Sequence, residues 1–460
     1  MSAKRIRRNF VVPINQPTGG EFSFRNGSSL IQIQMAASPV GLITDSVRLN
    51  YKLRLNKPGS SLLVPTFPNN NQNIAADAAY ELLLDSRVGA DCVIDVVNWS
   101  SGATNSSLES IRQYGRLLAI TNPLTKSKNK MDGEVQGGNL PVASRQKVSG
   151  NMVNTENFIS VPIKCGLLEG IEGGVLPLGI NGVNGLSLGI TLQNDSMALK
   201  SSQADANDCY YSLLDVNLTY DVIEYDDATT QDLNKPKTGV MEFLSYSTLY
   251  SVINSSDDQQ NFNPSTSKTQ SIFTSSVPAT HLNNFAENSF STGNLKNINT
   301  GTGKYSDNVL LNRVSFIRNG TLSPLEYQIE TQTSSLETTA RPVLISLLKE
   351  VFSSRDEETK ENMISPNTQF SEQTSVNPAT GKEVFSLKTT VSTEAQNEPV
   401  VAYGVNFDPI SNQGQNFAGN NSYGLRLETT LNGSSPNALT TFVKSLNVLQ
   451  YSPQGIQVSN

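Results

Sequence analysis

Apolar and polar residues alternate with a period of two over many short stretches of the chain. The clearest stretches cover residues 31–35, 47–55, 186–192 and 214–222. Because successive side chains of a strand point to opposite faces of a sheet, each stretch predicts a strand with one buried and one solvated face. This pattern is typical of antiparallel β-sandwiches rather than of parallel α/β sheets. The sequence therefore predicts an all-β fold.

Two stretches with helical spacing interrupt this pattern. Ser106 and Glu109 form a capping box, with Ser106 as the N-cap and Glu109 at the third helical position. Leu108, Ile111, Gly115 and Leu118 follow at roughly helical spacing, which predicts a helix at about 107–119 that packs on a sheet edge. A second helix is predicted at 341–353, with Pro342 in its first turn.

Two local features refine the prediction. Asn319 and Gly320 lie between two apolar stretches, and this dipeptide favours a tight hairpin turn, although the flanking residues also permit a longer loop ending near Pro324. The single tryptophan, Trp99, follows Val96 and Val97, which indicates a core or edge position rather than an exposed binding platform.

The same order of elements occurs twice, with little identity between the two halves. We predict two eight-stranded antiparallel jelly rolls in tandem, each with a short helix and long loops. The first covers residues 1–225, including a basic arm at residues 1–10, and the second covers residues 241–460. Residues 226–240 lack alternation and contain Pro236, so they form the predicted linker.

Size and charge support this division and narrow the possible partners. A chain of 460 residues suits two domains of about 200 residues each. The formal net charge of −7 argues against binding of nucleic acid by the protein as a whole. The exception is the N-terminal cluster of Lys4, Arg5, Arg7 and Arg8. This cluster is interpreted either as a solvated tail or as an arm that contacts phosphate on nucleic acid or lipid.

The absence of predicted signal and membrane-spanning segments, together with the cysteines, indicates the cellular compartment in which the chain is made. The basic start is not followed by an apolar segment, so no secretory signal is predicted, and no apolar run is long enough to span a membrane. The three cysteines, Cys92, Cys165 and Cys209, have no spacing typical of a metal site. We therefore expect synthesis in a reducing compartment without secretion.

Candidate catalytic chemistry is sparse. His281 is the only histidine, and no nucleophile motif accompanies it. The glycine-rich residues 301–304 lack the strand and helix that a phosphate-binding loop needs, and the acidic residues 356–358 lack the spacing of a calcium loop. Paired carboxylates for glycoside hydrolysis stay open, because the sequence does not give their separation. We expect no enzyme activity, metal or cofactor.

Several stretches, taken in their order along the chain, resemble the double jelly-roll major capsid proteins of double-stranded DNA viruses, of the polinton-like virus and virophage type. The resemblance covers most of the chain and has eight parts, which are residues 47–53, residues 89–94 followed by Glu109 and Tyr114, and then residues 166–168, 186–192, 214–224, 316–327, 403–407 and 425–427. Each motif is loose, and their order across two halves gives the specificity.

The resemblance implies a structural protein of the virion. It implies a homotrimer with a pseudo-hexagonal outline that tiles an icosahedral shell beside neighbouring capsomers, penton proteins and minor capsid proteins. It also places the N-terminus near the inner face of the shell, close to nucleic acid or an internal membrane. Two alternatives stay open, a glycan-binding or glycan-cleaving β-sandwich such as a spike or lectin, and a minor capsid or penton protein, which usually has a single roll.

Overall fold

The computed structural model describes most of the predicted strands. The described residues are 4–38, 40–56, 81–82, 88–102, 104–125, 148–149, 158–169, 175–179, 185–199, 208–225, 238–254, 257–285, 289–290, 309–318, 321–328, 372–376, 383–387, 402–407, 414–418, 423–431, 436–452 and 455–459. The predicted helix at 341–353 and most of the predicted linker at 226–240 lie outside them.

The strands before residue 225 form two antiparallel sheets. The first sheet contains β1 (Lys4–Val11), β2 (Glu21–Phe22), β4 (Val40–Ile43), β5 (Arg48–Asn56), β10 (Phe158–Pro162), β11 (Val175–Pro177) and β13 (Tyr210–Glu224). The second sheet contains β3 (Leu30–Met35), β12 (Leu186–Leu192), β7 (Ile94–Ser101) and β8 (Ser107–Arg112), in that order across the sheet.

Although the first sheet has seven strands, it is only four strands wide. Val222 of β13 pairs with Ile6 on one side and with Leu42 on the other. Leu213 of the same strand pairs with Phe22 and with Leu53. Strands β1 and β2 therefore lie end to end along one side of β13, and β4 and β5 lie end to end along the other. Strands β11 and β10 continue the sheet beyond β4 and β5.

The strands after residue 238 form two more sheets of the same width. One contains β14 (Gly239–Ile253), β23 (Asn437–Ser452), β16 (Thr269–Pro278), β21 (Ala402–Asn406) and β24 (Gly455–Ser459), with β16 and β24 end to end beside β23. The other has the order β15 (Asp257–Phe262), β22 (Tyr423–Leu431), β17 (Val309–Arg318), β18 (Thr321–Gln328). Two short ribbons, β6–β9 (Glu81–Leu82 and Val148–Ser149) and β19–β20 (Glu372–Val376 and Glu383–Leu387), lie outside these sheets.

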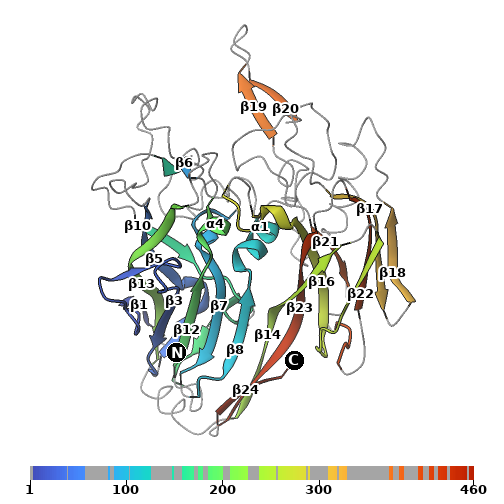
Figure 1. The fold of residues 1–460 in the computed structure, drawn as a ribbon. Coiled ribbons are helices and arrows are strands. Elements are labelled where there is room, and N and C mark those ends of the chain that lie inside the picture. Colours follow the sequence, from blue (N-terminus) through green and yellow to red (C-terminus); the bar gives the residue numbers. More distant parts are fainter. Residues whose placement is uncertain are drawn as a thin grey trace.

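The two halves share one topology. When the strand positions of each half are numbered in chain order, the sheets have the orders 1-8-3-6 and 2-7-4-5 in both halves. This order is that of an eight-stranded jelly roll, so the predicted fold is confirmed. In Figure 1 the strands of β1–β13 and those of β14–β24 stand side by side as two upright groups.

The period-two pattern is confirmed where it was clearest. Burial alternates residue by residue along β3 and β12, as the sequence predicts. The Asn319–Gly320 dipeptide lies between two paired strands, since Arg318 of β17 pairs with Thr321 of β18. Pro324 lies within β18, which is an edge strand and tolerates a residue without an amide hydrogen.

The predicted helix at 107–119 is wrong in its first half. Residues Ser107–Arg112 are strand β8, and the helix α1 covers Tyr114–Thr125. Ser100 pairs with Ser107 and Trp99 pairs with Glu109, so Leu108 is the extra residue of a β-bulge. The bulge lets both Leu108 and Glu109 be buried. Glu109 accepts hydrogen bonds from the first two amides of the short helix at Gly166–Glu169, so it does not cap the helix predicted at 107–119.

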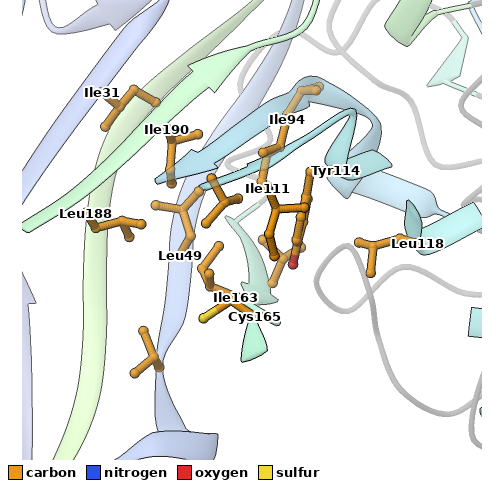
Figure 2. Packing of buried hydrophobic residues seen from close by; sticks show 14 of the residues in the cluster. Ile31, Leu49, Ile94, Ile111, Tyr114, Leu118, Ile163, Cys165, Leu188 and Ile190 are labelled. Atoms are coloured by element: carbon orange, nitrogen blue, oxygen red, sulfur yellow. The ribbon is translucent and has the colours of Figure 1, made fainter. Parts of the chain in front are cut away.

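The hydrophobic core runs between the sheets and continues from one half into the other. Figure 2 shows side chains from different strands meeting between the sheets of the first half, among them Leu49, Ile111, Leu188 and Ile190. Trp99 is fully buried on β7, as predicted. The same cluster includes aromatic residues of the second half, such as Phe273 and Phe442, whose rings stack with centroids 5.3 Å apart.

Candidate functional site

The basic N-terminal residues form a strand of the first sheet rather than an arm that projects from it. In β1, Lys4 pairs with Glu224 and Arg8 pairs with Tyr220 of β13. Ile6 and Val11 pack against the hydrophobic core. Strand β1 is also the first of the eight strand positions of its half, as β14 is in the second half. These residues are therefore part of the fold.

One carboxylate holds two of the four basic side chains. Asp221 accepts bonds from Arg5 Nη2 at 2.6 Å and from Arg7 Nε at 2.7 Å. Its side chain is 4% exposed, whereas those of Arg5 and Arg7 are 64% and 69% exposed. The hydrogen bond from Arg7, followed by that from Arg5, holds the pKa of Asp221 below its usual value against the opposing effect of burial. Two exposed cations share one buried anion, so the strand keeps a positive surface.

Exposed apolar side chains follow directly after the basic residues. Phe10, Val12 and Ile14 are all exposed, although each is large and apolar. Phe10 has a φ of 60°, which is uncommon for a residue other than glycine and marks the bend at the end of the regular pairing. The outer edge of the first roll therefore presents cationic and apolar groups beside each other.

The second feature is a buried junction between the two halves, centred on Glu109. Its carboxylate accepts hydrogen bonds from the backbone amides of Gly166 at 3.0 Å and Leu167 at 2.7 Å. The hydroxyl of Ser245 on β14 and the thiol of Cys165 donate to the same carboxylate. Burial nevertheless raises the pKa of Glu109 to about 7. A single side chain thus ties β8, the short helix α3 (Gly166–Glu169) and the second half together.

The two halves also touch through backbone atoms at this junction. A β-carbon added to Gly166 would lie 1.3 Å from the carbonyl oxygen of Leu244. Only glycine allows this approach. The hydroxyl of Tyr114 fixes the preceding segment, because it accepts a hydrogen bond from the amide of Lys164 at 2.8 Å. Glu109 and Tyr114 therefore hold the same loop against the second half.

A third contact across the junction comes from helix α1. Arg116 is buried and donates through Nη2 to the carbonyl of Ser289 at 2.7 Å. Burial lowers the pKa of Arg116 to about 10, which still leaves it protonated at neutral pH. Gly115 lies against the ring of Phe290, where an added β-carbon would come within 2.9 Å. These contacts fix the relative position of the two rolls.

The candidate catalytic residues are not brought together. His281 is buried in a 3-10 turn (Ala279–His281), where its carbonyl accepts a hydrogen bond from Ser289. Cys92, Cys165 and Cys209 are buried and form no disulfide. Within the described parts of the chain, no cluster of three His, Cys, Asp or Glu side chains is arranged to hold a metal ion. Residues 301–304 and 356–358 lie outside the described residues.

Helix length bears on membrane insertion. None of the helices in the described segments combines the length and the apolar character that a bilayer crossing requires.

Sequence comparison gives no relatives for this chain. No known family model matches it. No curated protein matches it either.

Solved structures match the chain from end to end. The PBCV-1 VP54 protein, fitted into a reconstruction of the virophage Sputnik, has a TM-score of 0.54 at 11% identity and covers 100% of this chain and 96% of its own. The Faustovirus major capsid protein has a TM-score of 0.56 at 9% identity, with 98% and 91% covered. The Sputnik virophage structure has a TM-score of 0.50 at 9% identity, with 100% and 88% covered. The fold of this chain is therefore the double jelly roll of these proteins.

Proposed function

We propose that this chain is the major capsid protein of a double-stranded DNA virus. The observation that carries the proposal is the repetition of one eight-strand order over the whole chain, in a fold matched along its full length by viral capsid proteins. A minor capsid or penton protein is expected to have a single roll, and two rolls favour the major protein.

The rigid junction between the rolls suits a tile. Three copies of a two-roll subunit place six similar rolls around one axis, so a homotrimer has a pseudo-hexagonal outline. Such a tile needs a fixed angle between its rolls, because an error in that angle accumulates over a shell. The contacts of Glu109, Gly166 and Arg116 across the junction supply that fixed geometry.

We place the boundary between the rolls within the predicted linker at residues 226–240, before the start of β14. The last strand of the first roll ends at Glu224 and the first strand of the second begins at Gly239. The proposed location of the protein is the capsid of the virion, after synthesis in a reducing compartment. The three buried cysteines form no disulfide, which agrees with such a compartment.

We assign the basic strand β1 to contacts inside the shell. Arg5, Arg7 and Arg8 are exposed on an edge strand, beside the exposed Phe10. This combination of cationic and apolar groups suits phosphate on the genome or on an internal membrane. Neighbouring capsomers, penton proteins and minor capsid proteins are the other expected partners.

The oligomeric state tests the proposal. Light scattering of the purified full-length chain at micromolar concentration is expected to give three times the 49.8 kDa of one chain. A stable monomer under these conditions would count against the proposed function. A dimer would count against it as well, since it cannot produce the pseudo-hexagonal outline.

A further inference from the structure

A groove lies where the outer face of the sheet β3–β12–β7–β8 meets strand β14. Figure 1 shows where these strands lie in the fold. The volume of the groove is about 570 Å³. That volume is within the range of roughly 300–1,000 Å³ typical of small-ligand sites. The hydroxyl of Thr248 on β14 donates to the carbonyl of Arg112 at 3.0 Å, which fixes this wall of the groove to its floor. The groove is therefore built from both halves of the chain.

The floor of the groove is a row of uncharged residues that crosses four strands. Gly189 pairs with Gln32 on one side and with Asn98 on the other, and Asn98 pairs with Ser110. With strands about 4.8 Å apart, the row is about 14 Å long. Its side chains offer amide and hydroxyl groups, each able to donate or accept. A solvated sheet face usually carries charged residues, whereas this row carries none.

Gly189 leaves the middle of the floor flat. An added β-carbon would meet nothing closer than the carbonyl oxygen of Asn98 at 3.8 Å, so neither the backbone conformation nor the space requires glycine here. The absence of a side chain therefore creates room over the floor. A flat ligand can lie across the row there and reach the amides of Gln32 and Asn98.

Strand β14 supplies an aromatic ring, Tyr250, and two charged residues of the sheet, Asp95 and Arg112, lie beside the uncharged row. Tyr250 is 52% exposed, in contrast to Phe243 on the same strand, which is buried. Burial of its hydroxyl end, followed by the nearby charge of Asp95, raises the pKa of Tyr250 to about 12, so the hydroxyl remains a donor at neutral pH. Asp95 is oriented by hydrogen bonds from Gln113 at 3.2 Å and Gln193 at 3.4 Å. Arg112 completes the lining at this corner.

We infer that this groove binds a short neutral oligosaccharide, a function beyond the proposed role in the shell. The exposed ring of Tyr250 suits the apolar face of a sugar ring. The amides and hydroxyls of the floor suit sugar hydroxyls, which also both donate and accept. The long, flat, uncharged row suits an extended chain of linked sugars better than a single charged metabolite.

Binding of defined oligosaccharides to the full-length protein tests this inference. Cellohexaose, xylohexaose, mannohexaose and chitohexaose are offered singly at up to 10 mM, with saturation-transfer NMR as the readout. We expect saturable binding of at least one of them. The variants Tyr250→Ala and Gly189→Leu are each expected to weaken that binding at least tenfold, the first by removing the ring and the second by filling the space over the floor, where the new β-carbon would meet no atom closer than 3.8 Å. Val252→Ala is the matched control, since Val252 is exposed on the same strand outside the groove.

Three results would overturn the inference. The first is no binding of any of the four sugars, and the second is binding that both groove variants leave unchanged. The third is dissociation of the native oligomer by Tyr250→Ala or Gly189→Leu, which would make the groove a contact between copies of the chain. Light scattering of the same samples distinguishes a failure of this inference from a failure of the proposed function. A trimer that binds no sugar refutes only sugar binding by the groove, and a monomer that binds sugar refutes only the proposed capsid function.

Discussion

Gly166 and Leu244 bring the two rolls into backbone contact, since a β-carbon on Gly166 would lie 1.3 Å from the carbonyl oxygen of Leu244. The amide of the same glycine donates to Glu109 at 3.0 Å. The junction therefore depends on a residue without a side chain and on a buried carboxylate. Gly166 and Glu109 can each be replaced separately to test the junction.

Replacement of Gly166 by alanine is expected to separate the rolls. The opposing atoms belong to the backbone of Leu244 and cannot move aside as a side chain can. We expect a loss of more than about 3 kcal/mol in the free energy of unfolding, measured by urea denaturation. Gly115→Ala is the control, because the atoms that crowd its β-carbon belong to the ring of Phe290 and the backbone carbonyl of Asp91 is at an ordinary contact distance of 3.5 Å, and it is expected to cost about 1 kcal/mol. Equal stability of the two variants would refute the backbone contact.

Glu109 is expected to make stability depend on pH near neutrality. Its pKa is about 7 in the folded chain against a usual value of 4.5, with burial as the main cause. The folded chain thus holds the proton more tightly than the unfolded chain, so stability is greatest below about pH 4.5 and falls until about pH 7. The full change is about 3 kcal/mol.

Urea denaturation at pH 5 and pH 8 measures this change. The wild-type chain is expected to lose about 2.5 kcal/mol more than Glu109→Gln between the two values, because glutamine does not titrate and part of the full change is already lost at pH 5. The exposed residue Glu242 provides a control, and Glu242→Gln should retain the wild-type dependence. The same pH dependence in wild type and Glu109→Gln would show that the carboxylate is already ionised or not buried.

Asp221 is expected to keep strand β1 in the sheet. Asp221→Asn removes both ion pairs with Arg5 and Arg7, so β1 should open more often. Trypsin is then expected to cleave after the N-terminal arginines roughly tenfold faster, as followed by mass spectrometry. Glu242→Gln, which loses the exposed pair with Lys268, should leave this cleavage unchanged. Cleavage at the wild-type rate in Asp221→Asn would mean that the ion pairs do not hold the strand.

Substitution of Arg8 tests whether β1 binds phosphate without disturbing the fold. Its side chain is exposed, so Arg8→Gln should fold normally. If β1 contacts phosphate, the variant should bind DNA or anionic vesicles less tightly, and the slope of log K against log salt should fall by about 1. Lys268→Gln is the control, because it removes the same positive charge from another part of the surface. Unchanged affinity and slope in Arg8→Gln would remove the proposed inner-face contact of this residue.

The strands with regular alternation could be predicted from the sequence, because burial on one face imposes a period of two. Strand β12 is an example, with burial that alternates from Leu186 to Leu192. Strand β1 does not show this alternation, because its partly buried residues, Ile6 and Val11, are separated by exposed arginines and a shift in register. The sequence therefore indicates a charged arm where the structure has an edge strand.

The junction could not be predicted, because it depends on contacts between distant segments. Ser106 and Glu109 have the spacing of a capping box, but the partners of Glu109 are more than fifty residues away. A bulge at Leu108 also interrupts the period-two pattern of β8, because it buries two consecutive residues. Likewise, Tyr250 is exposed and Phe243 on the same strand is buried, a difference that depends on how β14 packs against the rest of the fold.

Electron microscopy of the purified full-length protein in negative stain tests directly whether the chain forms a pseudo-hexagonal shell tile. We expect particles with threefold symmetry and a pseudo-hexagonal outline, in which each subunit contributes two of six similar lobes. Isolated two-lobed particles, or rings with another symmetry, would contradict the assignment of this chain as a shell-forming capsid protein.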